Sequence, residues 1–204
     1  HVKAARRRTE LAAQLSEVRA KAARRLQKRV AEELGQLAME GAKLEVNLEP
    51  HPEGFGPHGQ ERVEFRVATN PGMPVSPLRD AASGGELSRV MLALAGQGAR
   101  GGAATYVFDE IDAGIGGNTA RAVGERLRAL GEERQVLCIT HLPQVASVAG
   151  AHFRIEKRVS GGQTTAEVER VDGDELVAEI VRMLGGDRGD ETASRHAREL
   201  LEAA

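Results

Sequence analysis

The sequence is poor in aromatic residues and in cysteine. Phe, Tyr and Trp together make up 2% of the 204 residues, and tryptophan is absent. Proteins that hold single-stranded nucleic acid without sequence preference stack its bases on aromatic side chains, so this composition argues against such a surface. Cys138 is the one cysteine. It cannot form an internal disulfide, and its apolar neighbours favour a small buried side chain.

Long hydrophobic runs are also missing. No apolar run approaches the ~20 residues of a membrane-spanning helix, and the start at His1 does not resemble a secretory signal peptide. The hydrophobic share of 41% and the charged share of 28% are typical of soluble globular proteins. We therefore expect a cytoplasmic protein without a membrane partner.

A third absence concerns nucleotide binding. The sequence contains no phosphate-binding loop G-x-x-x-x-G-K-[ST], and the late glycine pairs 161–162 and 185–186 are not followed by Lys and Ser or Thr. That loop supplies a cradle of backbone amides and a lysine for the β- and γ-phosphates. The chain by itself is therefore not expected to hydrolyse ATP.

The segment 1–41 is predicted to form one long helix. Apolar residues recur in steps of three and four, and no Gly or Pro interrupts them before Gly35. The apolar stripe is narrow, which suits a coiled-coil seam as well as a helix that faces a core. Because no N-cap is recognisable, we expect the sequence to begin inside an element of a longer protein.

Charge is distributed unevenly along the chain. Residues 1–33 contain ten Lys or Arg and four Glu, a net charge of +6, which leaves −8 for the remainder of a chain whose total is −2. This asymmetry indicates two surfaces with different partners. A solvated face is the more common reason for such a basic stripe, and contact with DNA phosphates is the alternative. The candidate DNA contacts are Arg24, Arg25, Lys28 and Arg29.

The remaining periodicity predicts a mixed α/β fold. Polar and apolar residues alternate over 43–48 and 62–67, which predicts a two-stranded antiparallel element. Two buried strands at 103–108 and 135–140 flank an amphipathic helix at 118–130, the pattern of a βαβ unit with a parallel strand pair. A hairpin and two short helices are expected after them, at 153–171, 175–184 and 191–201.

The segment 83–89, Ser-Gly-Gly-Glu-Leu-Ser-Arg, predicts an unusual helix start. Ser83 is suited to be the N-cap, and Glu86 three residues later completes a capping box. Gly84 and Gly85 add nothing to helix stability, but they allow a ligand to approach the backbone closely. Amides at a helix N-terminus favour an oxyanion such as phosphate. By itself, the segment is explained equally well as an ordinary capped helix.

Two acids follow the first buried strand, and a histidine follows the second. Asp109 and Glu110 are expected at the carboxyl edge of the sheet, where α/β folds bind ligands. Neighbouring residues on a strand point to opposite sides. One carboxylate can therefore hold Mg²⁺ while the other activates a water molecule. His141 comes directly after the next strand.

These segments, in this order and at these spacings, resemble the ATP-binding-cassette ATPases. Residues 83–89 match the signature loop of that superfamily, 105–117 its Walker B strand and D-loop, and 136–141 its switch histidine. Within the SMC-like group, the match is closest to the RecN family of bacterial DNA repair proteins, and it spans most of 75–201.

The resemblance implies the C-terminal lobe of an ABC/SMC-type ATPase head with a long N-terminal coiled-coil helix. Such a lobe has a mostly parallel sheet with flanking helices and hairpins. The expected parts are the base of a coiled-coil arm at 1–41, an antiparallel β element at 42–72 and the ATPase lobe at 73–204.

The resemblance also implies a role for each matched residue. Asp109 would be the metal ligand, Glu110 the general base and His141 the sensor of the γ-phosphate. Asp112 would be the D-loop residue at the interface between two heads. The signature residues that would contact the nucleotide held by the partner head are Ser83, Gly84, Gly85 and Glu86.

The implied activity is ATP hydrolysis between two heads, with ATP and Mg²⁺ as cofactors, to control DNA binding or end tethering in double-strand-break repair. The implied partners are the Walker A lobe of the same protein, a second copy joined through the head or the coiled coil, and double-stranded DNA ends in the nucleoid. One alternative is a nucleotide-independent interaction module with a degenerate cassette, although the intact acids and histidine argue against decay. Another is a different SMC-like ATPase or a transporter ATPase, and transporters lack such a helical arm.

Overall fold

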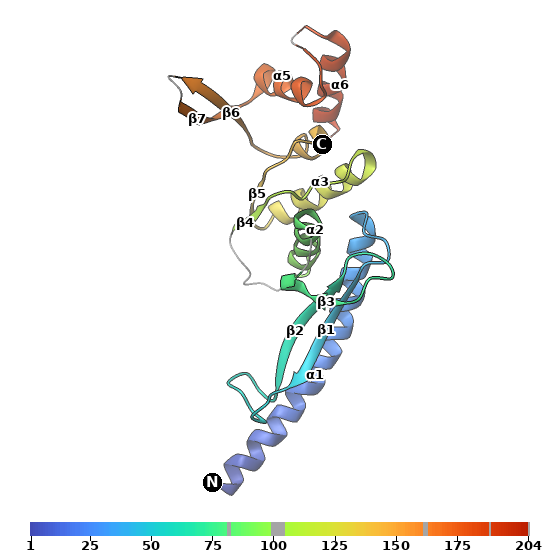
Figure 1. The fold of residues 1–204 in the computed structure, drawn as a ribbon, viewed down its shortest axis with the longest axis vertical. Helices are drawn as coiled ribbons and strands as arrows, with labels where there is room; N and C mark the ends of the chain where they lie inside the picture. The colour runs from blue at the N-terminus through green and yellow to red at the C-terminus, as the bar shows by residue number, and fades with distance from the viewer. Residues whose placement is uncertain (81–82, 99–104, 161–162, 188, 204) are drawn as a thin grey trace. The chain divides into compact units, whose positions relative to one another are not determined.

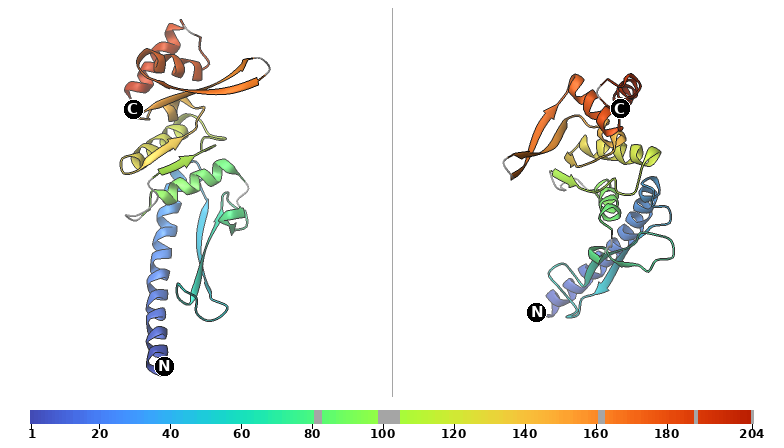
Figure 2. Two further views of the ribbon diagram at one scale, coloured as in Figure 1. Left: turned by 90° about the vertical axis from the view of Figure 1, so that its left-hand side faces the viewer. Right: turned by 45° about the horizontal axis from the view of Figure 1, so that its top comes forward.

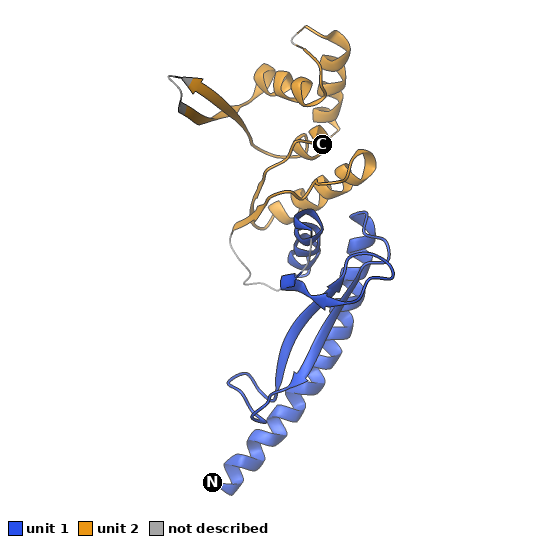
Figure 3. Ribbon diagram, in the orientation of Figure 1, with its two compact units in different colours: residues 1–102 blue, residues 103–204 orange. Residues whose placement is uncertain are grey.

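The chain folds as two compact units, residues 1–102 and 103–204 (Figure 3). The structure is a computed structural model that describes residues 1–80, 83–98, 105–160, 163–187 and 189–203. Helices, strands and their labels are drawn in Figure 1. Among the described helices, none combines the length and the apolar character needed to cross a membrane.

The first unit is built on the long helix α1, Val2–Gln36. The helix was predicted to run to about Gly41, but it ends five residues earlier. Ala38 and Gly41 adopt positive φ angles of 54° and 82°, which turn the chain away from the helix axis. Val30 and Leu34 near its end are fully buried. Towards the N-terminus the apolar stripe is open to solvent, with Leu11 48% and Val18 61% exposed.

An antiparallel sheet lies along α1 (Figures 1 and 2). Strands β1, Lys43–Pro50, and β2, Glu61–Ala68, pair in the register Lys43↔Ala68 to Pro50↔Glu61, which confirms the predicted two-stranded element. The two-residue strand β3, Ser76–Pro77, adds to the outer edge of β2, and the short 3₁₀ helix η1, Leu78–Asp80, follows it. Alternation puts Leu44 and Val67 on the buried face.

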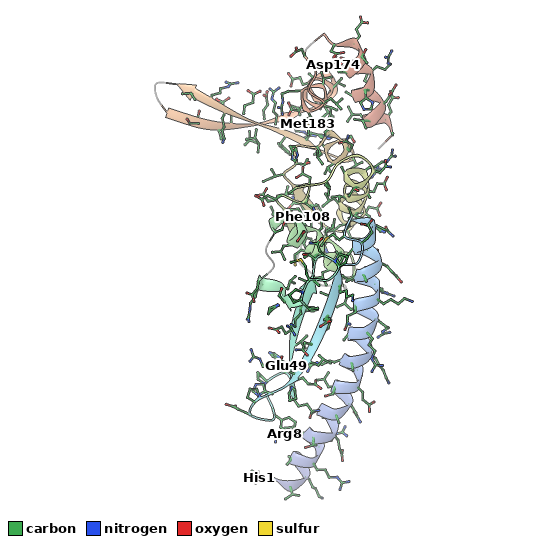
Figure 4. All side chains as sticks on the ribbon, turned by 45° about the vertical axis from the view of Figure 1, so that its right-hand side comes forward. His1, Arg8, Glu49, Phe108, Asp174 and Met183 are labelled. Carbon is green, nitrogen blue, oxygen red and sulfur yellow. The ribbon has the colours of Figure 1, made fainter. Side chains whose placement is uncertain are left out.

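The loop between β1 and β2 is fastened to α1 by polar contacts. Arg19 donates from Nη2 to the carbonyl oxygen of His58 at 2.6 Å, and Gln60 donates from Nε2 to Ser16 Oγ at 2.9 Å. The guanidinium of Arg8, labelled in Figure 4, lies 4.2 Å from the ring centroid of Phe55. Arg8 and Arg19 therefore make contacts within the first unit.

Helix α2, Gly84–Ala95, completes the first unit and contacts α1. It begins as predicted, with Ser83 as the N-cap residue, and ends at Ala95. Its buried side chains include Val90 and Leu92, and α1 provides one of the surfaces against which the helix packs.

The second unit starts with the predicted βαβ arrangement. Strands β4, Thr105–Phe108, and β5, Gln135–Cys138, are parallel, with α3, Gly117–Gly131, between them in the chain. The part of the predicted strand before Thr105 lies outside the described residues. The short helix α4, Pro143–Ala146, packs on α3 at Gly124. A Cβ at that glycine would lie 2.8 Å from Val148 Cγ2, so glycine allows the close approach.

A hairpin and two helices complete the second unit. Strands β6, His152–Ser160, and β7, Gln163–Val171, pair antiparallel as predicted. Helices α5, Gly173–Met183, and α6, Glu191–Glu202, pack around a small core of Ile180, Val181 and Ala197. Figure 4 shows the hairpin extending away from α5, whose ends are marked by Asp174 and Met183.

One face of the β4–β5 pair is bare in the part of the chain that the structure describes. Val107, Leu137 and Ile139 are 66%, 49% and 53% exposed, whereas Phe108 on the opposite face is buried. The prediction that both strands are buried is wrong for this face within the described residues. Parallel sheets are normally covered on both faces, and the helix that follows β4 covers only one of them.

Candidate functional site

The two predicted acids lie in a sharp turn directly after β4. The strand ends at Phe108, so the alternation of a strand does not determine where Asp109 and Glu110 point. Glu110 has a φ of 57°, in the left-handed region that residues other than glycine rarely adopt. Its amide donates to Asp109 Oδ1 at 2.9 Å, and its carbonyl accepts from the amide of Ala113 at 3.0 Å. Both acids are exposed. Such backbone conformations cost about 1–3 kcal/mol and cluster at functional sites.

Asp112 joins the loop after β4 to the loop after β5. Its Oδ2 atom accepts hydrogen bonds from Thr140 Oγ1 at 2.5 Å and from the amide of His141 at 2.9 Å. His141 Nδ1 lies 3.0 Å from the same oxygen. Asp112 is buried, at 3% exposure. The carboxyl ends of both strands are thereby held together, and the amide of Ile139 continues the ladder by donating to the carbonyl of Phe108.

His141 is tied to the protein at one ring nitrogen and open to solvent elsewhere. Its side chain is 73% exposed although Nδ1 contacts the buried carboxylate of Asp112. Thr140 supports this turn, because its hydroxyl also accepts from the amide of Leu142 at 3.0 Å. No role was predicted for Thr140. Its position between a strand and the histidine is only a weak sequence signal for a site residue. The contact with Asp112 is what identifies it as part of the site.

The predicted site residues fall into the two units of the chain. Asp109, Glu110, Asp112 and His141 gather at the carboxyl ends of β4 and β5 in the second unit. The signature segment 83–86 lies at the start of α2 in the first unit, as do the candidate DNA contacts on α1. The second-unit residues therefore form one local site, and the signature forms another.

The start of α2 has the geometry expected of a capped helix. Ser83 has extended backbone angles, φ −118° and ψ 125°, and its Oγ accepts from the amide of Glu86 at 3.5 Å. The Glu86 carboxylate accepts from Asn70 Nδ2 at 3.3 Å. Gly84 is exposed and Gly85 is buried. The first amides of any helix lack partners within the helix, and the exposed Gly84 leaves the backbone approachable.

A metal ion at this site would depend on the nucleotide. Among the described residues, no group of three or more His, Cys, Asp or Glu side chains could hold a metal. Mg²⁺ is commonly bound through one or two carboxylates together with water and substrate phosphates, rather than by a cage of protein ligands. The exposed carboxylate of Asp109 fits that pattern.

Cys138 is the last residue of β5, is partly buried, and is predicted to be unreactive. Burial, followed by the charges of Asp112 and Asp109, raises the pKa of its thiol to about 12 from an ordinary 9.0. At pH 8 the folded protein would therefore contain about 1000-fold fewer thiolates at this position, and the thiolate is the nucleophile. We expect iodoacetamide to label the native protein at least about 100-fold more slowly than the urea-unfolded protein. Mass spectrometry measures the labelling rate, with Cys138→Ser as the unlabelled control. Equal labelling rates for the native and the unfolded protein would contradict this prediction.

The four candidate DNA contacts on α1 are all exposed. Arg24, Arg25, Lys28 and Arg29 project from the same stretch of the helix, and Lys28 Nζ lies 3.9 Å from Glu32 Oε1. An ion pair between side chains this exposed contributes little to stability. These basic groups therefore remain accessible to an anionic partner.

Comparison with known proteins gives a consistent set of relatives. No protein-family model matches the chain. The DNA repair protein RecN of Xylella fastidiosa is 47% identical over 197 residues, which cover 95% of this chain and 35% of that protein. RecN of Halalkalibacterium halodurans is 42% identical over 94% of this chain and 35% of its own length. RecN of Deinococcus radiodurans is 48% identical over 81% of this chain and 29% of its own length.

Solved structures show the same fold. The Smc head domain with a coiled coil and joint from Pyrococcus yayanosii matches 81% of this chain and 30% of that chain, with a TM-score of 0.55 and 22% identity. A chain from work on the ATP-driven dimerization and DNA-stimulated activation of SMC ATPases matches 85% of this chain and 99% of its own length, with a TM-score of 0.50 and 16% identity. The chain therefore has the α/β fold of SMC head domains, with a long helix at its N-terminus.

Proposed function

Because the chain is RecN-like over nearly its whole length and spans 35% of those relatives, we propose that it is the C-terminal lobe of the ATPase head of an SMC-like DNA repair protein. One observation carries the proposal. Two exposed acids follow one parallel strand and an exposed histidine follows the next, and Asp112 joins the loop of the acids to the loop of the histidine. This is the edge at which α/β folds bind ligands.

Each residue of the site has a task in ATP hydrolysis. Asp109 would hold Mg²⁺ together with water and the nucleotide phosphates, and the ion would neutralise phosphate charge. Glu110 accepts the proton of the attacking water, for which its exposed carboxylate is suited. His141 contacts the γ-phosphate through the exposed part of its ring. Positioning and charge stabilisation account for most of the catalysis of phosphoryl transfer.

The bare face of β4 and β5 is evidence for a second lobe that packs on it. Val107, Leu137 and Ile139 expose apolar side chains on a parallel sheet that would ordinarily be covered. The chain also lacks a phosphate-binding loop. We propose that the Walker A lobe of the same protein covers this face and supplies the loop, so that ATP is bound only by the completed head.

A second head completes the catalytic arrangement in this proposal. The signature residues contact the nucleotide held by the partner head, where the α2 amides and helix dipole favour its phosphates. These residues are Ser83, Gly84, Gly85 and Glu86. The exposed apolar residues Leu11 and Val18 of α1 are a further contact surface, suited to a coiled-coil arm.

DNA is the proposed ligand of the dimer, and binding it would place the protein in the cytoplasm at the nucleoid. ATP hydrolysis between the heads would control the binding or tethering of double-stranded ends. The test of the proposed chemistry is ATP turnover by the full-length protein with and without Glu110→Gln. Wild-type turnover in the variant would show that Glu110 is not the general base.

Charge reversal on α1 tests the DNA contact. Replacing Arg24, Arg25, Lys28 and Arg29 by Glu in the full-length protein should weaken binding to linear duplex DNA. It should also flatten the plot of log K against log[salt] by up to about 3–4 units, because each lost phosphate contact removes about 0.9. Binding titrations at several salt concentrations measure the slope.

The matched control reverses exposed arginines of the second unit. They are Arg121, Arg128, Arg195 and Arg198. Both variants change the net charge by the same amount, so a general electrostatic effect would appear in both. An unchanged slope in the α1 variant would assign its basic residues to solvation.

A further inference from the structure

The carboxylate of Asp112 contacts the loop after β5 at three atoms. One oxygen, Oδ2, accepts hydrogen bonds from Thr140 Oγ1 at 2.5 Å and from the His141 amide at 2.9 Å. His141 Nδ1 lies 3.0 Å from the same oxygen. The partners come from a loop 28 and 29 residues further along the chain. Hydrogen bonds to a charged acceptor are about twice as strong as neutral ones. The cluster therefore determines how the loop after β5 is placed.

The contact with Nδ1 does more than hold the loop. An ionised carboxylate only accepts hydrogen bonds. The proton of the imidazole therefore lies on Nδ1, which donates a hydrogen bond to Asp112. The contact restricts the rotation of a side chain that is 73% exposed. It also determines that Nε2 is the ring nitrogen available to a ligand. Outer partners of histidine set the tautomer and orientation of the ring in this way.

We propose that Asp112 is a positioning residue that acts within its own head, through His141. It fixes the proton of the imidazole on Nδ1 and directs Nε2 towards the γ-phosphate. The inference rests on the proposed function, in which His141 contacts that phosphate. It differs from a role at the surface between two heads, because the Asp112 side chain is 4% exposed and its carboxylate is occupied by Thr140 and His141 of the same chain.

Nitrogen NMR of the full-length protein labelled with ¹⁵N-histidine tests the contact directly. The His141 signals are assigned by their loss in His141→Ala. We expect the wild type to show a protonated Nδ1 and the Asp112→Ala variant to show a mixture of tautomers. A wild-type ring protonated on Nε2 alone, or a spectrum unchanged in Asp112→Ala, would overturn the proposal.

A double-mutant cycle tests the effect on turnover. Asp112→Ala should lower kcat for ATP by about 10–100-fold, the range known for losing the outer partner of a metal-bound histidine. His141→Ala should be impaired as well, and the double variant should be no slower than His141→Ala. If Asp112 had only a structural role, the double variant would instead show the kcat losses of both single variants together. If Asp112→Ala does not fold, Asp112→Asn, which keeps the volume of the side chain, takes its place in the cycle.

The outcomes separate the two proposals. If His141→Ala turns over ATP at the wild-type rate, the γ-phosphate role of His141 in the proposed function is wrong, and the effect of Asp112 on turnover falls with it. If His141→Ala is impaired and the two losses are additive, only the positioning role of Asp112 is wrong.

Discussion

Replacing Glu110 with glutamine in the full-length protein is expected to lower ATP turnover by about 10²–10⁴-fold, the usual contribution of a general base. Glutamine keeps the size of the side chain but cannot accept the proton of the attacking water. The backbone at this position has a φ of 57°, and the substitution does not change the demand for that conformation. Phosphate release measured under saturating ATP gives the rate.

The control for this prediction is Glu132→Gln, a change of the same chemistry at an exposed acid just after α3. It should leave turnover unchanged. ATP binding by Glu110→Gln should stay within a few-fold of the wild type, because a base acts in the reaction and contributes little to nucleotide affinity. If Glu110→Gln hydrolyses ATP at the wild-type rate, the general base is another group.

The chain alone is expected to show no ATP hydrolysis, whereas mixing it with a Walker A-bearing N-terminal lobe should produce activity that depends on Glu110. The reason is the missing phosphate-binding loop, without which the β- and γ-phosphates have few protein partners. Robust hydrolysis by the chain alone would reveal a phosphate site elsewhere and overturn the proposal of a split head.

The surface for the second lobe can be tested in the same mixture. Leu137→Asp puts a charge on the bare face of β4 and β5 and should abolish the gained activity, since burying an unpaired charge costs several kcal/mol. Val63→Asp on β2 is the matched control, because Val63 is 47% exposed and Leu137 is 49% exposed. Equal activity of both variants would show that the second lobe does not cover this face.

Much of the fold could be predicted from local pattern. The alternation over 43–48 and 62–67 predicted β1 and β2, and the apolar run and helix between 103 and 140 predicted the parallel pair. One error occurred where a local pattern ends. The predicted end of α1 was five residues late, because the turn depends on the positive φ angles of Ala38 and Gly41, which periodicity does not report.

The predicted burial of β4 and β5 failed on one face for a different reason. A continuous apolar run indicates a strand covered on both sides, and the run is present. The cover is not supplied by the described part of this chain, so Val107 and Leu137 are exposed. In the proposed complete head, the second lobe would cover this face.

The sequence by itself determined the candidate chemistry: two acids after one strand, a histidine after the next, and a glycine-rich helix start, all without a phosphate-binding loop. The folded structure was needed to show that Asp112 is buried in contact with Thr140 and His141, and that Glu110 occupies a left-handed turn. The physical reason is separation along the chain. Residues 28 apart meet only when the register of two parallel strands brings their ends together, and periodicity carries no information about register across such a distance.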